Sequence, residues 1–459
     1  MKSQAIDPSA SIAATTSQKN RAPGTVVPEP AFHAPWLLFW VAFLVRVAYI
    51  TLAHTYRVRP FDDHFTFGWE MGRIARALVS GHGYADPFRG NTGPTAWVAP
   101  LYPLLMAAVF KVFGIYTLKS AWVLLTLNSF FSGLTVLAIW EIGARCFNRR
   151  VASWAAWLWV LYPAAMQYAV RWIWEMSLTT CLFCWVLVLA LRMRNIGGIV
   201  EVGPAEFGTT MTRERWAVFG LLWGAIGLSN PTLLILLPIS GLWLLAGSAD
   251  WRRQLSGVAV SALVFSACLT PWIVRNSRAF GQFVPMRGNF GAEFYLGNGP
   301  GATGLLMEYD QPMQAPDQLR LYAQMGEIAY SKMRGQLAMG VVRHDPWHFA
   351  GDVLKRIFFF WAAVPHPTDD APWVEYGRNL NFIFTSVCGL LGLVWALKQK
   401  APAAGMFAWA FLLLPLVYYF VTVHARFRHP LEPLIVVLGV YLFQSAQPRK
   451  TARRKTKAV

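Results

Sequence analysis

The sequence predicts an all-α polytopic membrane protein, and three observations support this prediction. The chain is 55% hydrophobic, 15% aromatic and only 14% charged, which is too apolar for an ordinary soluble domain. Apolar segments long enough to cross a bilayer as helices recur along it. Its 22 tryptophans and 15 tyrosines suit the membrane interface, where amphipathic rings lie between acyl chains and water. We expect about ten transmembrane helices.

Three parts of the chain are expected. Residues 1–33 are rich in Ser, Ala, Thr and Pro, which is typical of a disordered tail, here cytoplasmic. Residues 34–446 form the membrane domain, with outer loops at 55–119 and 271–379. Residues 447–459 form a basic cytoplasmic tail. The net charge of +18 resides mostly at segment ends and in this tail, so we expect contact with membrane lipids and no nucleic-acid partner.

The expected crossings follow one another through the membrane domain. In chain order they are 35–52, 120–143, 151–170, 176–191, 216–228, 233–245, 256–270, 381–397, 406–423 and 434–443. Basic clusters such as FNRR follow the crossings that point inward, which places both chain ends in the cytoplasm. Two other apolar stretches, 97–114 and 353–363, carry proline or basic residues, and we expect them to be partly embedded helices.

Adjacent carboxylates, Asp62 and Asp63, follow the first crossing. A short amphipathic helix comes next, with one apolar face formed by Phe67, Met71, Ile74 and Leu78. Such a helix is expected to lie along the membrane surface. A carboxylate near an apolar surface can act as a general base, so this pair is a candidate catalytic site. The alternative is a solvated acidic loop.

Glu175 is the next candidate, at an outer turn in the segment RWIWE. It can take part in binding a substrate, or it can be a carboxylate at a helix end that pairs with Arg171. The residues support both interpretations equally.

Basic residues supply the remaining candidates. Arg275 and Asn276 end the crossing in PWIVRN, and a loop with Gly and Asn follows. Arg426 and Arg428 lie in HARFRH, a basic segment that our topology places outside the membrane. Arginine can bind phosphate oxygens with two parallel hydrogen bonds, so these residues suit a phosphate-bearing lipid. Anchoring to lipid head groups without catalysis is the alternative.

These segments, in this order, resemble the GT-C superfamily of integral-membrane glycosyltransferases. The resemblance rests on the acidic pair after the first span, ARALVSGHGY, APLYPLLMAAVFKVFG, Glu175, and PWIVRN followed by a loop ending in YLGN. It is greatest to the bacterial relatives of dolichyl-phosphate-mannose protein mannosyltransferases, which include aminoarabinose and galacturonic acid transferases. It covers the chain from about Pro35 to Phe443.

The resemblance implies an inverting transfer of one sugar from a polyprenyl-phosphate carrier to an acceptor outside the cytoplasmic membrane. It implies that Asp62 supplies the catalytic carboxylate, although many relatives have glutamate where this chain has Asp63. Glu175 matches an acid of the family, Arg275 matches a basic position near the donor phosphate, and Arg426 matches more loosely. The acceptor is a lipid, a glycan or a protein.

The chemistry of the residues agrees with a lipid-phosphate donor. Such a donor has a good leaving group, so the site needs a base for the acceptor proton and cations for the phosphate. A divalent metal is possible if three carboxylates converge, but the sequence lacks the histidine spacing of a zinc site. Two other functions stay open, a lipid or solute transporter and a non-catalytic assembly factor for envelope polysaccharide.

Overall fold

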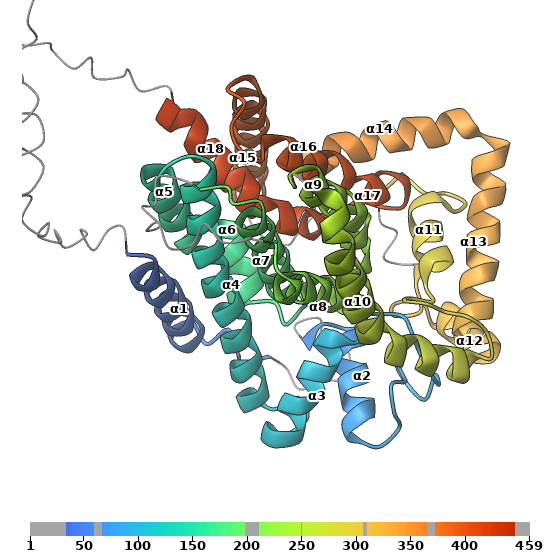
Figure 1. Cartoon of the computed structure of the whole chain (residues 1–459). Helices are drawn as coiled ribbons and strands as arrows, with labels where there is room; N and C mark the ends of the chain where they lie inside the picture. Colours follow the sequence, from blue (N-terminus) through green and yellow to red (C-terminus); the bar gives the residue numbers. More distant parts are fainter. Residues whose placement is uncertain are drawn as a thin grey trace, which may run out of the picture.

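The computed structural model describes residues 34–58, 67–197, 211–248, 250–305, 310–364 and 372–445. Within these ranges the regular secondary structure is helical. A single isolated antiparallel β-bridge pairs Ala85 with Pro94. Both predicted tails and the acidic pair Asp62 and Asp63 lie outside the described residues. The all-α prediction is confirmed (Figure 1).

The first half of the chain supplies α1 Pro35–Leu52, α2 Glu70–Val79, α3 Leu101–Phe113, α4 Leu118–Cys146, α5 Arg149–Val160, α6 Pro163–Val170, α7 Met176–Met193, α8 Arg213–Ser229, the 3₁₀ helix η5 Pro231–Leu236 and α9 Leu237–Ala246. The second half supplies α10 Trp251–Phe280, α11 Phe290–Asn298, α12 Pro316–Met325, α13 Glu327–His344, α14 Pro346–Ala362, α15 Pro372–Lys398, α16 Ala404–Leu413, α17 Leu416–Phe420, the 3₁₀ helix η7 Ala425–Leu431 and α18 Glu432–Ser445.

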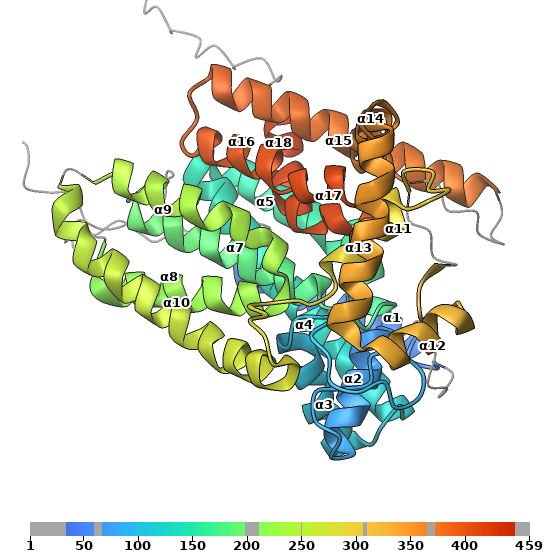
Figure 2. The same cartoon turned by 90° about the vertical axis from the view of Figure 1, so that its right-hand side faces the viewer.

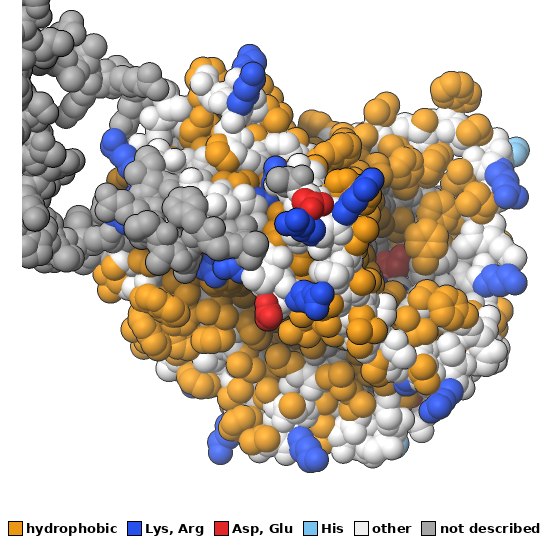
Figure 3. All heavy atoms as spheres, viewed as in Figure 1, with side chains coloured by type: hydrophobic (Ala, Val, Ile, Leu, Met, Phe, Trp, Pro, Cys, Tyr) orange, Lys and Arg blue, Asp and Glu red, His pale blue; other side chains and the backbone are white. Residues whose placement is uncertain are grey.

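Five helices among the described residues are long and apolar enough to cross a membrane. They are α1, α4, α7, α10 and α15, and three shorter apolar segments accompany them at 101–113, 231–246 and 404–420. Apolar side chains cover much of the face shown in Figure 3, with Lys and Arg scattered among them. This composition of the surface is that of a multi-pass membrane protein.

Three of the expected crossings are interrupted, and each interruption has a proline. The expected 151–170 segment divides into α5 and α6 before Pro163, and 406–423 divides into α16 and α17 at Pro415. The 233–245 segment starts as the 3₁₀ helix η5 and becomes α-helical only at Leu237, next to Pro238. Proline lacks an amide hydrogen and clashes with the preceding turn, so apolar composition alone overstates helix continuity.

The helix α10 is longer than the sequence predicts, because a proline does not end it. Its expected crossing ends at Thr270 because Pro271 follows, yet the helix continues through Pro271 to Phe280. The Thr270 hydroxyl donates a hydrogen bond of 2.7 Å to the carbonyl of Ser266, one turn earlier, so a side chain supplements the backbone bonds there. The predicted outer loop from residue 271 therefore begins as helix.

The amphipathic helix α2 is present, but its apolar face contacts protein. Phe67, just before the helix, packs edge-to-face on Phe110 and Tyr116 with ring centroids 5.9 and 5.0 Å away. Met71 and Ile74 are buried. The expectation that this face lies against the membrane surface is therefore wrong, because α3 and the loop after it cover that face.

An arginine inside the first span stabilises the break between α5 and α6. Arg46 is fully buried in α1 and donates hydrogen bonds of 3.0 Å to the carbonyls of Ala42 and Trp159. Pro163 occupies the position whose N–H would otherwise donate to the Trp159 carbonyl in a continuous helix. The guanidinium thus replaces a hydrogen bond that the proline removes.

The helices surround a central region from several sides. Figure 1 shows α2 and α3 below the bundle, while α11 to α14 form a separate arch at the right. In Figure 2 the arch lies at the right, and α8, α9 and α10 lie at the left of the same view. The start of α7, the start of α2, the start of α11 and η7 all contribute to the cavities between these parts.

Candidate active site

Two adjoining cavities lie between these elements and share four lining residues, namely Glu70, Trp174, Glu293 and Arg426. We call the first, of about 740 Å³, the tryptophan cavity, because Trp69, Trp172 and Trp174 line it. The second, of about 460 Å³, is the carboxylate cavity, lined by Glu70, Glu175 and Glu293 with Arg287 and Arg426. The four shared residues place charged groups of both signs at the junction.

Glu175 lies directly before α7 and lines the carboxylate cavity. Its Oε2 atom is buried and has no hydrogen-bond partner among the described residues. Burial raises the pKa of this carboxyl group, while the charges of Arg426 and Arg287 act against the rise. Arg171, the alternative partner proposed from the sequence, instead donates to the Tyr49 hydroxyl at 3.2 Å. An unpartnered carboxylate oxygen facing a cavity indicates a place for a ligand.

Glu70 is the first residue of α2, and an unusual turn aims it at the same cavity. Gly68 and Trp69 before it both have positive φ, 71° and 45°, and Trp69 has ψ −107°. A tryptophan in this region of backbone space is strained, and such strain concentrates at functional sites. The turn packs Gly68 against the chain just before Glu175, so two carboxylates from distant segments are brought to one cavity.

Replacing Gly68 by alanine is expected to impair this turn. An added Cβ would lie 2.5 Å from the carbonyl oxygen of Ile173, and the positive φ disfavours any side chain. We expect the variant to unfold at lower temperature and to lose activity, whereas Gly81→Ala, at a positive φ with open space around it, should cost only the backbone strain. Thermal unfolding of the two purified variants checks this, and equal transitions would contradict it.

Arg287 enters the cavity from the segment before α11, and Glu293 enters it from the first turn of α11. Arg287 Nε donates a 2.8 Å hydrogen bond to the carbonyl of Trp97, and its Nη2 lies 3.7 Å from Glu293 Oε1. Asn289 Nδ2 donates to the same Glu293 oxygen at 2.9 Å. The segment expected as a glycine-containing loop is thus helical from Phe290 to Asn298, and it supplies Glu293 to the site beside Arg287, which precedes it.

Arg426 comes from η7, on the opposite wall. Its guanidinium lies over the ring of Trp174, 4.3 Å from the centroid, and it lines both cavities. The side chain of His424 caps η7 by accepting a 3.3 Å hydrogen bond from the backbone N–H of Arg426. Stacking on the tryptophan fixes the guanidinium plane and leaves its edge available to an anion.

Arg428 belongs to the core below this turn. It is fully buried, its guanidinium lies 3.2 Å from the centroid of Phe382, and it pairs with Glu432 at 3.2 Å. Glu432 also contacts His429 Nδ1 at 2.9 Å. Arg428 lines neither cavity, so the structure places it under the site and not within it.

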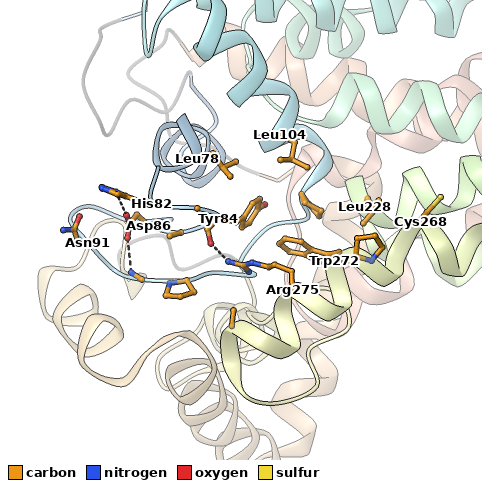
Figure 4. A pocket seen from close by; sticks show the side chains of 17 residues that line it. Leu78, His82, Tyr84, Asp86, Asn91, Leu104, Leu228, Cys268, Trp272 and Arg275 are labelled. Carbon is orange, nitrogen blue, oxygen red and sulfur yellow. Dashed lines mark hydrogen bonds and ion pairs between the residues drawn. The ribbon is translucent and has the colours of Figure 1, made fainter. Parts of the chain in front are cut away.

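Arg275 lines a third cavity, and Asn276 is buried next to it in the chain. This loop cavity, of about 930 Å³, lies between α3, α10 and residues 82–94 and shares no lining residue with the other two (Figure 4). Arg275 donates to the carbonyls of Tyr84 and Thr95, and Asn276 is buried and donates to the Val284 carbonyl at 3.2 Å. Their expected contact with a donor phosphate stays a prediction.

Three residues of the site escaped the sequence analysis, namely Glu70, Arg287 and Glu293. Glu70 carried a signal, because it lies at the start of an amphipathic helix but off its apolar face. Arg287 precedes the glycine-containing segment and Glu293 lies within it, but nothing in the local pattern distinguished them from other charges there. Among the described residues no group of three His, Cys, Asp or Glu side chains could hold a metal ion, and Asp62 and Asp63 lie outside them.

Comparison with solved structures identifies the fold. The chain superposes on the apo oligosaccharyltransferase AglB of Archaeoglobus fulgidus with a TM-score of 0.54 at 13% identity, covering 91% of this chain and 51% of AglB. AglB bound to an inhibitory peptide and dolichol-phosphate gives a TM-score of 0.50 at 13% identity, with 90% and 50% covered. This chain therefore spans about half the length of the first matches.

A third similarity is weaker overall. ArnT of Cupriavidus metallidurans bound to undecaprenyl phosphate gives a TM-score of 0.35 at 14% identity, covering 89% of this chain and 77% of ArnT. No family model and no curated protein sequence matches the chain. The similarity to AglB confirms the predicted GT-C fold of an all-α, polytopic membrane protein.

Proposed function

We propose that this chain is a membrane glycosyltransferase that moves one sugar from a polyprenyl-phosphate carrier to an acceptor hydroxyl. The observation that carries the proposal is the carboxylate cavity, where the unpartnered oxygen of Glu175 lies with two arginines, Arg287 and Arg426. A transfer from a lipid phosphate needs this combination, because carboxylates bind hydroxyl groups while guanidinium groups stabilise a departing phosphate. The GT-C fold agrees with this function.

In this proposal Asp62 is the base that takes the acceptor proton. Asp63 and Glu175 orient hydroxyl groups of the acceptor or the sugar, and Arg287 and Arg426 bind the phosphate. The AglB structure solved with dolichol-phosphate supports a lipid phosphate as the kind of carrier. Transfer proceeds with inversion at the sugar carbon, because one base and one leaving group act without a covalent intermediate.

We place the site at the outer face of the cytoplasmic membrane. The predicted topology puts the segments that carry Asp62, Glu175, Arg287 and Arg426 on one side of the membrane. Glu175, Arg287 and Arg426 line the carboxylate cavity together. At the other end of the bundle, Glu141 of α4 pairs with Arg145 and with Arg192 of α7, near the expected cytoplasmic basic cluster. The acceptor is a lipid, glycan or protein reached from the tryptophan cavity.

The test is turnover of a panel of polyprenyl-phosphate sugars by purified protein in lipid vesicles. Glu175→Gln keeps the size of the side chain but removes its charge, and we expect turnover to fall about 100-fold, as for a misplaced substrate. The matched control is Glu214→Gln, which makes the same change at an exposed position of α8. The control should retain wild-type turnover.

Two results would contradict the proposal. If the wild-type protein consumes no lipid-phosphate sugar with crude envelope acceptors, it is not this kind of transferase. If Glu175→Gln transfers sugar as fast as Glu214→Gln, the carboxylate cavity is not the reaction site. Solute flux across the same vesicles would then favour the transporter.

A further inference from the structure

We propose that Glu70 is the proton donor to the departing lipid phosphate. It lies at the junction of the two cavities, where the carboxylate of Glu293 also lies. This inference rests on the proposed function and adds a second acid–base group to it. Glu70 and Glu293 are the carboxylates that line both the tryptophan cavity and the carboxylate cavity, whereas Glu175 lines the second alone. A group that acts on a bond between donor and acceptor must face the space that both enter.

The backbone just before Glu70 has an unfavourable conformation that fixes the position of this residue. Gly68 and Trp69 adopt positive φ values in the two residues before the helix, and Gly68 lies too close to Ile173 to carry a side chain. Glycine adopts a positive φ readily, but Trp69 is strained there, and such strain persists where the surrounding structure imposes it. Its effect is to direct the first residue of α2 into the cavity junction.

The charged groups around Glu70 come from four elements. Glu293 comes from α11, Arg287 from the segment before it, Arg426 from η7 and Glu175 from the start of α7. Burial raises the pKa of Glu70 to about 7, with a further rise from the negative charge of Glu293, and Arg426 and Arg287 act in the opposite direction. At neutral pH the carboxyl group therefore exists in both forms, which is what a proton donor needs.

The leaving group matches such a donor. When the sugar leaves, the lipid phosphate becomes a phosphomonoester, whose second pKa is about 6. A carboxylic acid with a pKa near 7 can share its proton with that phosphate at little cost in free energy. A stronger acid is unnecessary, because Arg287 and Arg426 already stabilise the developing negative charge.

The proposed step balances in atoms and charge. The bond between the sugar's anomeric carbon and the phosphate oxygen breaks, and both electrons stay on that oxygen. The acceptor oxygen bonds to the anomeric carbon as its proton passes to the general base, and Glu70 gives its own proton to the phosphate oxygen. The base then releases its proton to water and Glu70 takes one from water, so that the net result is one proton moved from acceptor to phosphate.

The experiment compares the pH dependence of sugar transfer in the wild type and two variants. In the wild type, transfer should slow as the pH rises through about 7, because Glu70 loses its proton. Glu70→Gln cannot donate a proton of this kind, so we expect turnover about 100-fold lower and no such decline. Glu293→Gln removes the repelling charge, which lowers the pKa of Glu70 and moves the decline to lower pH.

The outcomes separate this inference from the proposed function. A decline above pH 7 that persists in Glu70→Gln, or that Glu293→Gln leaves in place, would overturn the proton-donor role even though the protein is a transferase. If Glu70→Gln does not fold, the shift in Glu293→Gln decides alone. Absence of transfer by the wild type at every pH would instead overturn the proposed function. The exposed Glu214→Gln serves again as the matched control and should keep the wild-type profile.

Discussion

Replacing Asp62 by asparagine should lower sugar transfer by about 100-fold to 10,000-fold, which is the range for loss of a general base. Asparagine has nearly the same shape but cannot accept the acceptor proton, so donor binding should be retained. Transfer and donor binding are measured on the same purified protein in lipid vesicles. The sequence at this position provides its own control, because Asp63→Asn makes the same change one residue away.

The pair of variants also identifies which acid is the base. Loss in Asp62→Asn with a small effect in Asp63→Asn agrees with the assignment, and the reverse pattern transfers the role to Asp63. Wild-type turnover in both would refute a base in this segment and leave Glu70 and Glu175 as the acids of the site.

Replacing Glu432 by leucine is expected to destabilise the protein by about 3 to 5 kcal/mol, because it leaves a buried cation without its partner. Glu432 is 1% exposed and contacts both Arg428 and His429. The loss should appear as a large fall in the thermal unfolding midpoint in detergent. Activity should fall as well, because η7 also carries Arg426 over Trp174.

A double variant separates charge from packing. In Arg428→Met with Glu432→Leu, both charges are gone, and the apolar pair is expected to recover most of the lost stability. If the single variant Glu432→Leu unfolds at the wild-type temperature, the buried pair contributes nothing and the explanation is wrong. If the double variant is no more stable than the single one, His429 and not Arg428 is the group that needs the carboxylate.

The helices were largely predictable from the sequence, and the residues of the site only in part. Hydropathy identifies the segments of α1, α4, α7 and α15, because a helix in lipid must be apolar along its length. It fails at Pro163 and at Pro271, where the outcome depends on which neighbours supply hydrogen bonds. At Pro163 the donor is Arg46, which is remote in sequence and leaves no local pattern, whereas at Pro271 it is the preceding residue, Thr270.

The candidate site shows the same limit. Glu175 and Arg426 were expected near a substrate, and the structure brings both to one cavity. Arg428, two residues from Arg426 and chemically identical, lies in the core instead, because Glu432 one turn later neutralises it. The two arginines of HARFRH thus have different roles, one in the cavity and one in a buried ion pair. Composition alone does not distinguish these roles.

The buried guanidinium of Arg46 has a consequence for biogenesis. Chain synthesis produces Arg46 more than one hundred residues before the Trp159 carbonyl to which it donates. An arginine near the middle of an inserting span costs about 2.5 to 3.5 kcal/mol. The guanidinium therefore gains its hydrogen bond to Trp159 only when the segment with α5 packs beside α1.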